Sequence, residues 1–257
     1  IMGNTPSVEV IDAKITALHD RPVGKAVRLL ERAGIFEKYA ITIAGLHHSG
    51  KSSFINTNMR VLQREWNQSF HAHCETGSGG GSNVTMLHSM VEPEDFPVQL
   101  YDTRAPYNNT DQEQAFFKDL LSKGVKPGTG QSDYEIDKLY RSRAAILVIH
   151  PDQLVNQRTA LIHILQSLTT PYRRPIVVIT HADEMSSSTL KDTEADARLL
   201  TGTDQVYLIE NYRKPKGSSN TQRNTRTDAT VCDILEAAMT AADRTFQAET
   251  LANKALA

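Results

Sequence analysis

Residues 41–56, ITIAGLHHSGKSSFIN, place a glycine-rich loop between an apolar run and a helix-like pattern. The loop itself, GLHHSGKS, fits the spacing G-x-x-x-x-G-K-[ST]. Its glycines allow the backbone to bring several amide protons toward one anion, and the following helix directs its positive end to the same place. A lysine adds a point charge, and a serine offers a hydroxyl to magnesium. The spacing predicts a nucleoside phosphate bound by Gly45, His47, His48, Ser49, Gly50, Lys51, Ser52 and Ser53.

Three further stretches, VQLYDTRAPYN, VVITHAD and VYLIENY, place polar side chains directly after expected strands. Ligands of open α/β sheets bind at the carboxyl ends of parallel strands, where the three stretches would meet. Asp102 can hold magnesium through water, and Asp183, three residues after Thr180, can accept both N–H groups of a guanine edge. Glu210 and Asn211 are placed to cover the base. An aspartate after a strand, such as Asp183, is more often a helix cap than a ligand. The order of the four motifs, each of which follows a strand, favours guanine binding.

From residue 39 onward, short apolar runs alternate with longer helical patterns, which is typical of a parallel sheet covered by helices. AAILVIH and PIVVIT lack polar alternation, as strands buried on both faces do. The expected fold is a three-layer α/β P-loop NTPase with a mostly parallel central sheet of about six strands. The expected strands are residues 39–44, 84–90, 98–101, 145–149, 176–180 and 206–209. The expected helices are residues 51–63, 112–122, 153–168, 188–200 and 230–247.

The chain divides into three expected parts. Residues 1–38 form an N-terminal arm, in which we expect a strand or helix, a turn and then a second, amphipathic helix. Residues 39–248 form the nucleotide-binding domain, and residues 249–257 form a tail. The stretch GSGGGS, residues 77–82, is either a mobile loop over the ligand or an engineered linker.

Charge and cysteine content narrow the range of partners. The net charge of −2 provides no basic field for nucleic acid, so no nucleic-acid partner is expected. The two cysteines, Cys74 and Cys232, have no metal-ligand spacing, which fits a reducing, cytoplasmic location. No run of about 18 apolar residues predicts a membrane span.

The stretch MGNTPS, residues 2–7, matches the N-myristoylation pattern if Met2 is the natural start. A lipid on Gly3 would give weak association with a membrane surface, because a single myristoyl chain binds only marginally. The alternative is a short tail that fits a loose pattern by chance.

Taken together, the loop, THAD and IENY resemble the GTP-binding domain of translation-factor-related P-loop GTPases. THAD looks like the Thr-Lys-x-Asp guanine motif with histidine at the lysine position. Its pairing with IENY and with the helix RTDATVCDILEAA looks most like the interferon-induced protein 44 group, near the dynamin-like and immunity-associated GTPases. The resemblance covers about residues 39–241. It implies GTP or GDP with Mg²⁺, a homodimer that pairs through the nucleotide face, and guanine surrounded by Thr180, His181, Asp183 and Asn211.

The resemblance also implies metal ligands. SNVT is similar to the family's first switch segment, which makes Thr85 a ligand for magnesium and the γ-phosphate beside Ser52 and Asp102. The alternative for Thr85 is a plain strand threonine. The second switch of the family reads Asp-x-x-Gly, whereas this chain has Ala105 at the glycine position. Alanine keeps the amide but restricts the backbone, which would weaken sensing of the third phosphate.

His48 stands where guanylate-binding proteins, whose loop resembles this one, carry a catalytic arginine. A protonated imidazole there would place charge near the transferring phosphoryl group. The alternative is that His47 and His48 contact the nucleotide or a partner without catalysis, which is favoured because histidine clamps phosphoryl groups less well than arginine.

Three functions therefore stay open: a slow GTPase that acts as a switch, a guanine-nucleotide-binding module without useful hydrolysis, and an ATP-using P-loop enzyme such as a kinase, in which Asp183 would be incidental.

Overall fold

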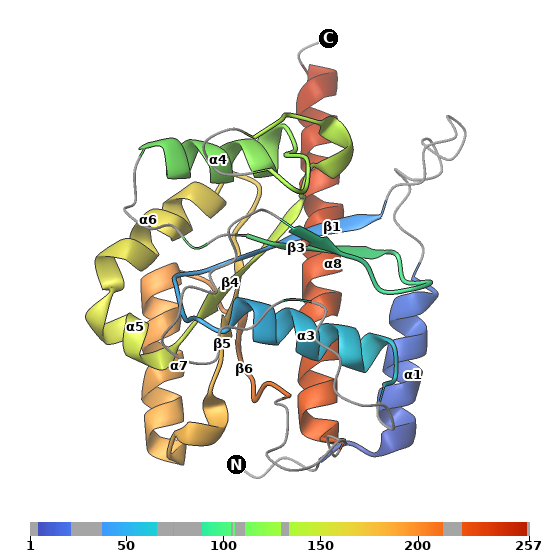
Figure 1. Cartoon of the computed structure of the whole chain (residues 1–257), viewed down its shortest axis with the longest axis vertical. Helices are drawn as coiled ribbons and strands as arrows, with labels where there is room; N and C mark the ends of the chain where they lie inside the picture. Colours follow the sequence, from blue (N-terminus) through green and yellow to red (C-terminus); the bar gives the residue numbers. More distant parts are fainter. Residues whose placement is uncertain are drawn as a thin grey trace.

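The central element of the protein is a six-stranded sheet with the order β2-β3-β1-β4-β5-β6 (Figure 1). The strands are β1 (Tyr39–Ala44), β2 (Ser89–Val91), β3 (Val98–Asp102), β4 (Ala144–Ile149), β5 (Ile176–Ile179) and β6 (Val206–Leu208). All neighbours run parallel except β2, which is antiparallel to β3. The computed structural model describes residues 5–21, 38–65, 74, 89–103, 105, 111–129, 134–212 and 223–255.

Helices cover both faces of the sheet and make it the middle of three layers (Figure 1). One face carries α1 (Val8–His19), α3 (Lys51–Leu62) and α8 (Thr225–Ala255). The other carries α4 (Asp111–Ser122), α5 (Pro151–Asn156), α6 (Arg158–Leu168) and α7 (Ser187–Thr201). The expected three-layer α/β fold with a mostly parallel sheet is confirmed.

Strand β4 shows why this sheet needs two covering layers. Successive side chains of a strand point to opposite faces, so a strand in the middle layer is expected to be mostly apolar along its whole length. Ala144, Ile146 and Val148 pack in the core under α8, whereas Leu147 and Ile149 pack in the core under α6. All six residues of β4 are buried.

Several elements differ from the predicted ranges. The helix expected over 153–168 is two helices, because Gln157 leaves helical geometry at φ −132° and ψ 30°. Helix α8 begins and ends beyond the predicted 230–247, so the predicted boundary after residue 248 lies inside it. Glu249, placed in the predicted tail, forms an ion pair with Arg141. Strand β2 covers only the end of the expected 84–90 strand, whose residues 84–88 lie outside the described part.

Helix α1 packs along α8, side by side with it in Figure 1. Ser7 caps the start of α1 through its side chain, and Ile11, Ile15 and Leu18 are buried in the same core as the sheet. Lys14 pairs with Asp233 of α8 at 2.6 Å. The N-terminal helix therefore shares the core of the domain built on the sheet. The second helix expected in the arm falls within residues 22–37, outside the described part.

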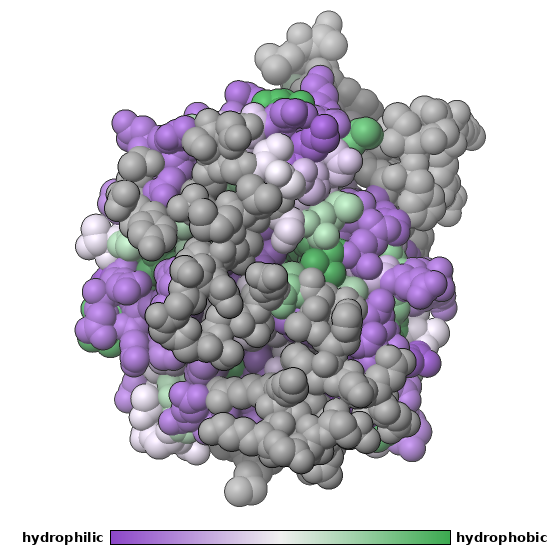
Figure 2. Space-filling model, viewed as in Figure 1, coloured by the Kyte–Doolittle hydropathy of each residue, from purple (hydrophilic) through white to green (hydrophobic). Residues whose placement is uncertain are grey.

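The surface is mixed in character. On the face seen in Figure 2, hydrophilic residues cover most of the coloured area, and hydrophobic ones form small areas between them. Both cysteines are free and buried. Among the described residues, no helix combines the length and apolar character that a membrane span requires. That same part of the chain holds no group of three or more His, Cys, Asp or Glu side chains arranged for a metal ion.

Candidate nucleotide site

The loop between β1 and α3 requires glycine at both ends. A Cβ atom on Gly45 would lie 2.2 Å from the carbonyl oxygen of Val148 in the neighbouring strand. Gly50 has φ +87°, and its Cβ would lie 3.2 Å from the Thr180 side chain. Because any larger residue would collide with backbone or adopt a strained conformation, these glycines keep the loop tight against β4 and β5.

Two side chains from other elements hold the backbone in the middle of the loop. Gln153 donates from Nε2 to the carbonyl oxygen of His47 at 2.7 Å, and Thr180 donates from Oγ1 to the carbonyl oxygen of Ser49 at 2.9 Å. Between these two carbonyls lies His48, whose φ of +60° is left-handed and uncommon for a non-glycine residue. The loop geometry is therefore imposed by contacts from β5 and α5.

Lys51 is a buried cation at the start of α3. Its side chain is 8% exposed, and Nζ donates to the carbonyl oxygen of Leu46 at 3.0 Å. Burial lowers the pKa of Lys51 to about 8, and the Asp102 carboxylate opposes part of this shift. A desolvated ammonium gains stability from a nearby anion, so this side chain fits a phosphate ligand.

The N-terminus of α3 opens toward the same loop. Gly50 occupies the N-cap position and has no side chain to bond the first amides of the helix, which belong to Lys51, Ser52 and Ser53. Free amides at a helix N-terminus attract anions. In addition, the fully buried Ser49 Oγ has no hydrogen-bond partner among the described residues. The predicted cradle residues 45–53 thus come together in a form that fits phosphate oxygens.

A pair of oxygen donors lies beside this cradle. Ser52 Oγ donates to Asp102 Oδ2 at 2.9 Å, which joins the start of α3 to the end of β3. Both are hard oxygen donors of the kind that magnesium prefers. Cys74 lies against Asp102: burial and that carboxylate, to which the thiol hydrogen-bonds, raise the pKa of Cys74 to about 12. Asn56 fixes the Cys74 backbone with two hydrogen bonds, of 2.8 and 2.9 Å.

The segment after β5 is the expected base-binding region. Thr180 is fully buried, His181 has a left-handed φ of +59°, and Asp183 is exposed in the 3-10 turn η2 (Ala182–Glu184). His181 Nδ1 lies 3.2 Å from Glu184 Oε1. Because Thr180 also bonds the Ser49 carbonyl oxygen, this segment is attached to the phosphate loop.

A second imidazole lies beside His181. His150, at the end of β4, has its ring centroid 4.6 Å from that of His181, with the planes tilted by 59°. Burial and the neighbouring His181 lower the pKa of His150, which keeps it neutral near pH 7.

The phosphate loop holds a second pair of histidines, His47 and His48, whose rings meet edge to face with their centroids 3.8 Å apart. Burial, His48 and Lys51 lower the pKa of His47.

The segment after β6 closes the other side of the region. Ala182 N donates to the Ile209 carbonyl oxygen at 3.3 Å, so the segments after β5 and β6 are adjacent. Asn211 is 7% exposed, and its Oδ1 has no hydrogen-bond partner among the described residues. Glu210 is exposed, and its carboxylate accepts a hydrogen bond from Asn224 at 3.3 Å. Asn211 therefore offers a buried acceptor, whereas the Glu210 side chain is engaged with the chain preceding α8.

Two predicted site residues lie outside the described part of the chain: Thr85 and Gly3. The same holds for residues 77–82. Ala105, at the position of the switch glycine, is described and is buried, with 3% exposure.

Sequence reasoning missed Gln153, His150 and Cys74. His150 and Gln153 form a capping box at the start of α5. The sequence signal for this box is a glutamine three positions after the N-cap residue. The proximity of His150 and Gln153 to the loop depends on chain segments about 100 residues apart in sequence and had no local signal.

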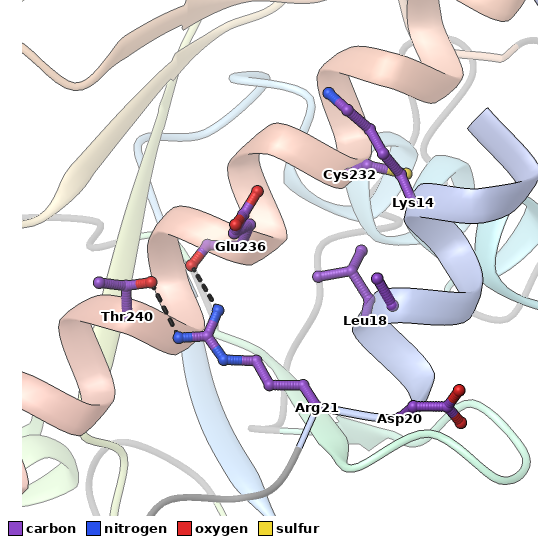
Figure 3. Close-up of a pocket in the computed structure, with 8 residues that line it drawn as sticks. Lys14, Leu18, Asp20, Arg21, Cys232, Glu236 and Thr240 are labelled. Atoms are coloured by element: carbon purple, nitrogen blue, oxygen red, sulfur yellow. Dashed lines mark hydrogen bonds between the residues drawn. The ribbon is translucent and has the colours of Figure 1, made fainter. Parts of the chain in front are cut away.

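A hollow of about 520 Å³ lies between α1 and α8, and none of the predicted nucleotide-site residues lines it (Figure 3). Arg21 reaches across it and donates to the Glu236 carbonyl oxygen at 3.4 Å and to Thr240 Oγ1 at 3.0 Å. Lys14 on its wall pairs with Asp233. Because these cations already have partners on α8, the hollow lacks the features that mark the loop as an anion site.

Comparison with known proteins gives matches only among solved structures, since no protein-family model and no curated protein matches the chain. A bacterial selenocysteine-specific elongation factor, EF-Sec, is 12% identical with a TM-score of 0.41, covering 68% of this chain and 25% of its own. An ADP-ribosylation factor-like GTP-binding protein, Sar1 from Encephalitozoon cuniculi in complex with GDP, is 14% identical with a TM-score of 0.42, covering 91% and 92%. A probable GTP-binding protein, engB, is 13% identical with a TM-score of 0.45, covering 78% and 98%.

The chain therefore spans about a quarter of the length of the elongation factor. The strand order and the loop between β1 and α3 place the protein in the three-layer P-loop class of α/β folds.

Proposed function

We propose that the protein binds guanine nucleotides and is a slow, magnesium-dependent GTPase that acts as a nucleotide-controlled switch. The observation that carries the proposal is the hydrogen bond from Thr180 to the Ser49 carbonyl oxygen. It attaches a segment with a base-reading carboxylate, Asp183, to a loop built for phosphate. A nucleotide is a ligand that spans both.

The phosphates would lie against the loop amides, the start of α3 and the Lys51 ammonium. Ser52 and Asp102 would hold Mg²⁺, directly and through water, and Thr85 is proposed as a further ligand by resemblance. When bound, the metal neutralises charge on the phosphate oxygens. Cys74 supports this arrangement because its hydrogen bond to Asp102 helps to orient the carboxylate.

The base would lie between the segments after β5 and β6. A carboxylate at Asp183 accepts two N–H groups from a guanine edge, and adenine offers no such pair. Asn211 supplies a buried acceptor, and His181 supplies an aromatic face beside the base. These positions, with the resemblance to the interferon-induced protein 44 group, favour guanine over adenine.

Hydrolysis is proposed to be slow because the groups that would accelerate the reaction are weak. The well-formed phosphate cradle accounts for binding and not for turnover. Ala105 replaces the switch glycine, and His48 replaces the arginine of guanylate-binding proteins. We expect His48→Ala to leave single-turnover hydrolysis within about twofold, since a histidine is a poor phosphoryl clamp. A loss of tenfold or more, on the scale of about 1.4 kcal/mol, would assign a catalytic role to His48.

The second candidate is a binding module that holds GTP or GDP without useful hydrolysis. The substitution at Ala105, buried in the structure, favours this reading, because the switch amide would be restrained. Single-turnover hydrolysis with Mg²⁺ separates the two candidates: product formed faster than in a protein-free control supports the GTPase.

The decisive experiment is to identify the nucleotide that co-purifies with the protein and to measure binding by calorimetry with Mg²⁺. We expect GDP or GTP in native mass spectra and no displacement by excess ATP. Displacement by ATP as effective as that by GTP would refute guanine specificity and favour an ATP-using enzyme. Absence of any guanosine ligand in both measurements would refute the proposal.

Location and assembly are proposed from sequence and resemblance alone. The protein is proposed to be cytoplasmic, with weak membrane association through a myristoyl group on Gly3, and to pair through its nucleotide face. Intact mass of the protein from its native host tests the lipid. Light scattering with GDP and with a non-hydrolysable GTP analogue tests nucleotide-dependent pairing.

A further inference from the structure

Gln153 joins two backbone segments that belong to different parts of the fold. Its Oε1 accepts a hydrogen bond from the His150 amide at 3.0 Å, and its Nε2 donates to the His47 carbonyl oxygen at 2.7 Å. The side chain is 5% exposed, so neither bond competes strongly with water. Gln153 therefore fixes the start of α5 to the phosphate loop.

The bond to His47 determines the direction of the next amide. In a trans peptide, the carbonyl oxygen and the following N–H point in opposite directions. Because the His47 carbonyl points to Gln153, the N–H of His48 points away from α5. The same argument applies to Ser49, whose carbonyl points to Thr180, so that the N–H of Gly50 points away from β5.

Two side-chain donors thus hold the peptide planes 47–48 and 49–50. The plane between them is held by the Ser49 amide, which donates to the Leu46 carbonyl oxygen at 3.2 Å. His48 has the left-handed φ of +60°, which a histidine does not adopt readily without restraint. Loop amides bind an anion only when several of them converge. Without Gln153, the 47–48 peptide plane, which carries the His48 N–H, would lose the hydrogen bond that fixes its direction.

We infer that Gln153 is a positioning residue for phosphate binding, acting through its hydrogen bond to His47 to aim the His48 amide at the nucleotide. This inference rests on the proposed function. It assigns to α5 a part in nucleotide binding that the sequence motifs do not include.

The side-chain amide is essential to this role because one bond needs a donor and the other an acceptor. Gln153→Glu keeps the acceptor for His150, and so the capping box, but removes the donor to His47. Gln153→Leu removes both at similar volume and adds no charge. Gln157→Leu, four residues on and exposed, is the matched control.

Binding of GDP with Mg²⁺ is measured by calorimetry, together with melting temperature and amide hydrogen exchange of the peptide covering residues 45–52 in the nucleotide-free protein. We expect both Gln153 variants to bind GDP about 3- to 10-fold more weakly, as for loss of one neutral hydrogen bond. Loop exchange should be faster in both, and the melting temperature should fall more in Gln153→Glu, whose buried carboxylate faces the His47 carbonyl oxygen, than in Gln153→Leu. Gln157→Leu should match the wild type throughout.

Affinity and loop exchange within twofold of the wild type in both variants would overturn the inference while leaving the proposed function intact. Weaker binding in Gln153→Leu alone would also overturn it, because the effect would then come from the capping bond to His150. If the wild type binds no guanine nucleotide, the proposed function fails separately. Loop exchange then decides whether Gln153 orders the loop: faster exchange in both variants supports it, and unchanged exchange refutes it.

Discussion

The hydroxyl of Thr180 lies 2.9 Å from the carbonyl oxygen of Ser49 and connects the end of β5 to the phosphate loop. The two residues are 131 positions apart in the sequence. A Cβ atom added to Gly50 would lie 3.2 Å from the Thr180 side chain. The same side chain therefore fixes the loop and disfavours any residue larger than glycine at position 50. The segment proposed to read the base and the loop proposed to bind phosphate therefore share one structural support.

Thr180→Val should weaken GDP binding by about 3- to 10-fold, because it removes the hydroxyl at nearly constant shape. Thr180→Ser keeps the donor and should bind within about twofold of the wild type. Calorimetry with Mg²⁺ measures both. Equal affinities for the valine and serine variants would show that the hydrogen bond has no part in binding.

GDP affinity should fall as the pH rises above about 8. Burial places the pKa of Lys51 at about 8 in the free protein, so the ammonium is mostly protonated at pH 7 and neutral at pH 9. A bound phosphate raises that pKa, so binding above pH 8 takes up a proton and weakens by up to about tenfold per pH unit. Fluorescence titration between pH 6.5 and 9.5 follows the change.

Lys51→Arg provides the control for this pH dependence. Arginine stays protonated across the range, so the variant should bind more weakly at pH 7 but with little change up to pH 9.5. A wild-type affinity that stays flat from pH 7 to 9.5 would contradict the role assigned to the Lys51 charge.

Asp102→Asn should remove most of the effect of magnesium on nucleotide binding. Asparagine can still accept the Ser52 hydrogen bond, but its amide is a weaker ligand for Mg²⁺ or its bound water. Wild-type affinity should drop about 10- to 100-fold when EDTA replaces Mg²⁺, and the variant should bind about equally in both conditions. An unchanged magnesium response, with a melting temperature like that of the wild type, would place the metal elsewhere.

Asp183→Asn should change base preference from guanine toward xanthine. In the proposed complex the carboxylate accepts two N–H groups of guanine, whereas an amide would pair with the carbonyl of xanthine at the same edge. Loss of GTP affinity on the order of 100-fold, with a gain for xanthosine triphosphate, is the expected pattern in competition assays. A variant that still prefers GTP would exclude Asp183 from the base site.

The parts of the fold with strong local signals were predictable. Strands β1, β4 and β5 are buried throughout and, apart from Thr42 in β1, lack hydrophilic alternation because both faces are covered. The phosphate loop has fixed glycine and lysine spacing. The break at Gln157 could not be predicted, since residues on either side continue a helical apolar pattern. The extension of α8 to Ala255 likewise depends on packing and on partners such as Arg141, not on local pattern.

The residue types of the candidate site carry local signals in the sequence, whereas the contacts that support them do not. Lys51, Ser52 and Asp102 come together as the strand order requires. The roles of Gln153 and Cys74 come from long-range contacts that carry no local pattern, because an isolated glutamine or cysteine has no fixed spacing from its partner.

Helix α1 lies along α8 and contributes Ile11, Ile15 and Leu18 to the core that also holds β1 and α3. These side chains share one core with α8 and the sheet, so removal of α1 would expose apolar surface that belongs to the sheet domain. The first helix and the sheet should therefore melt in a single cooperative transition. A truncated chain that begins near residue 38 would therefore be less stable than the full chain, because it lacks part of the core.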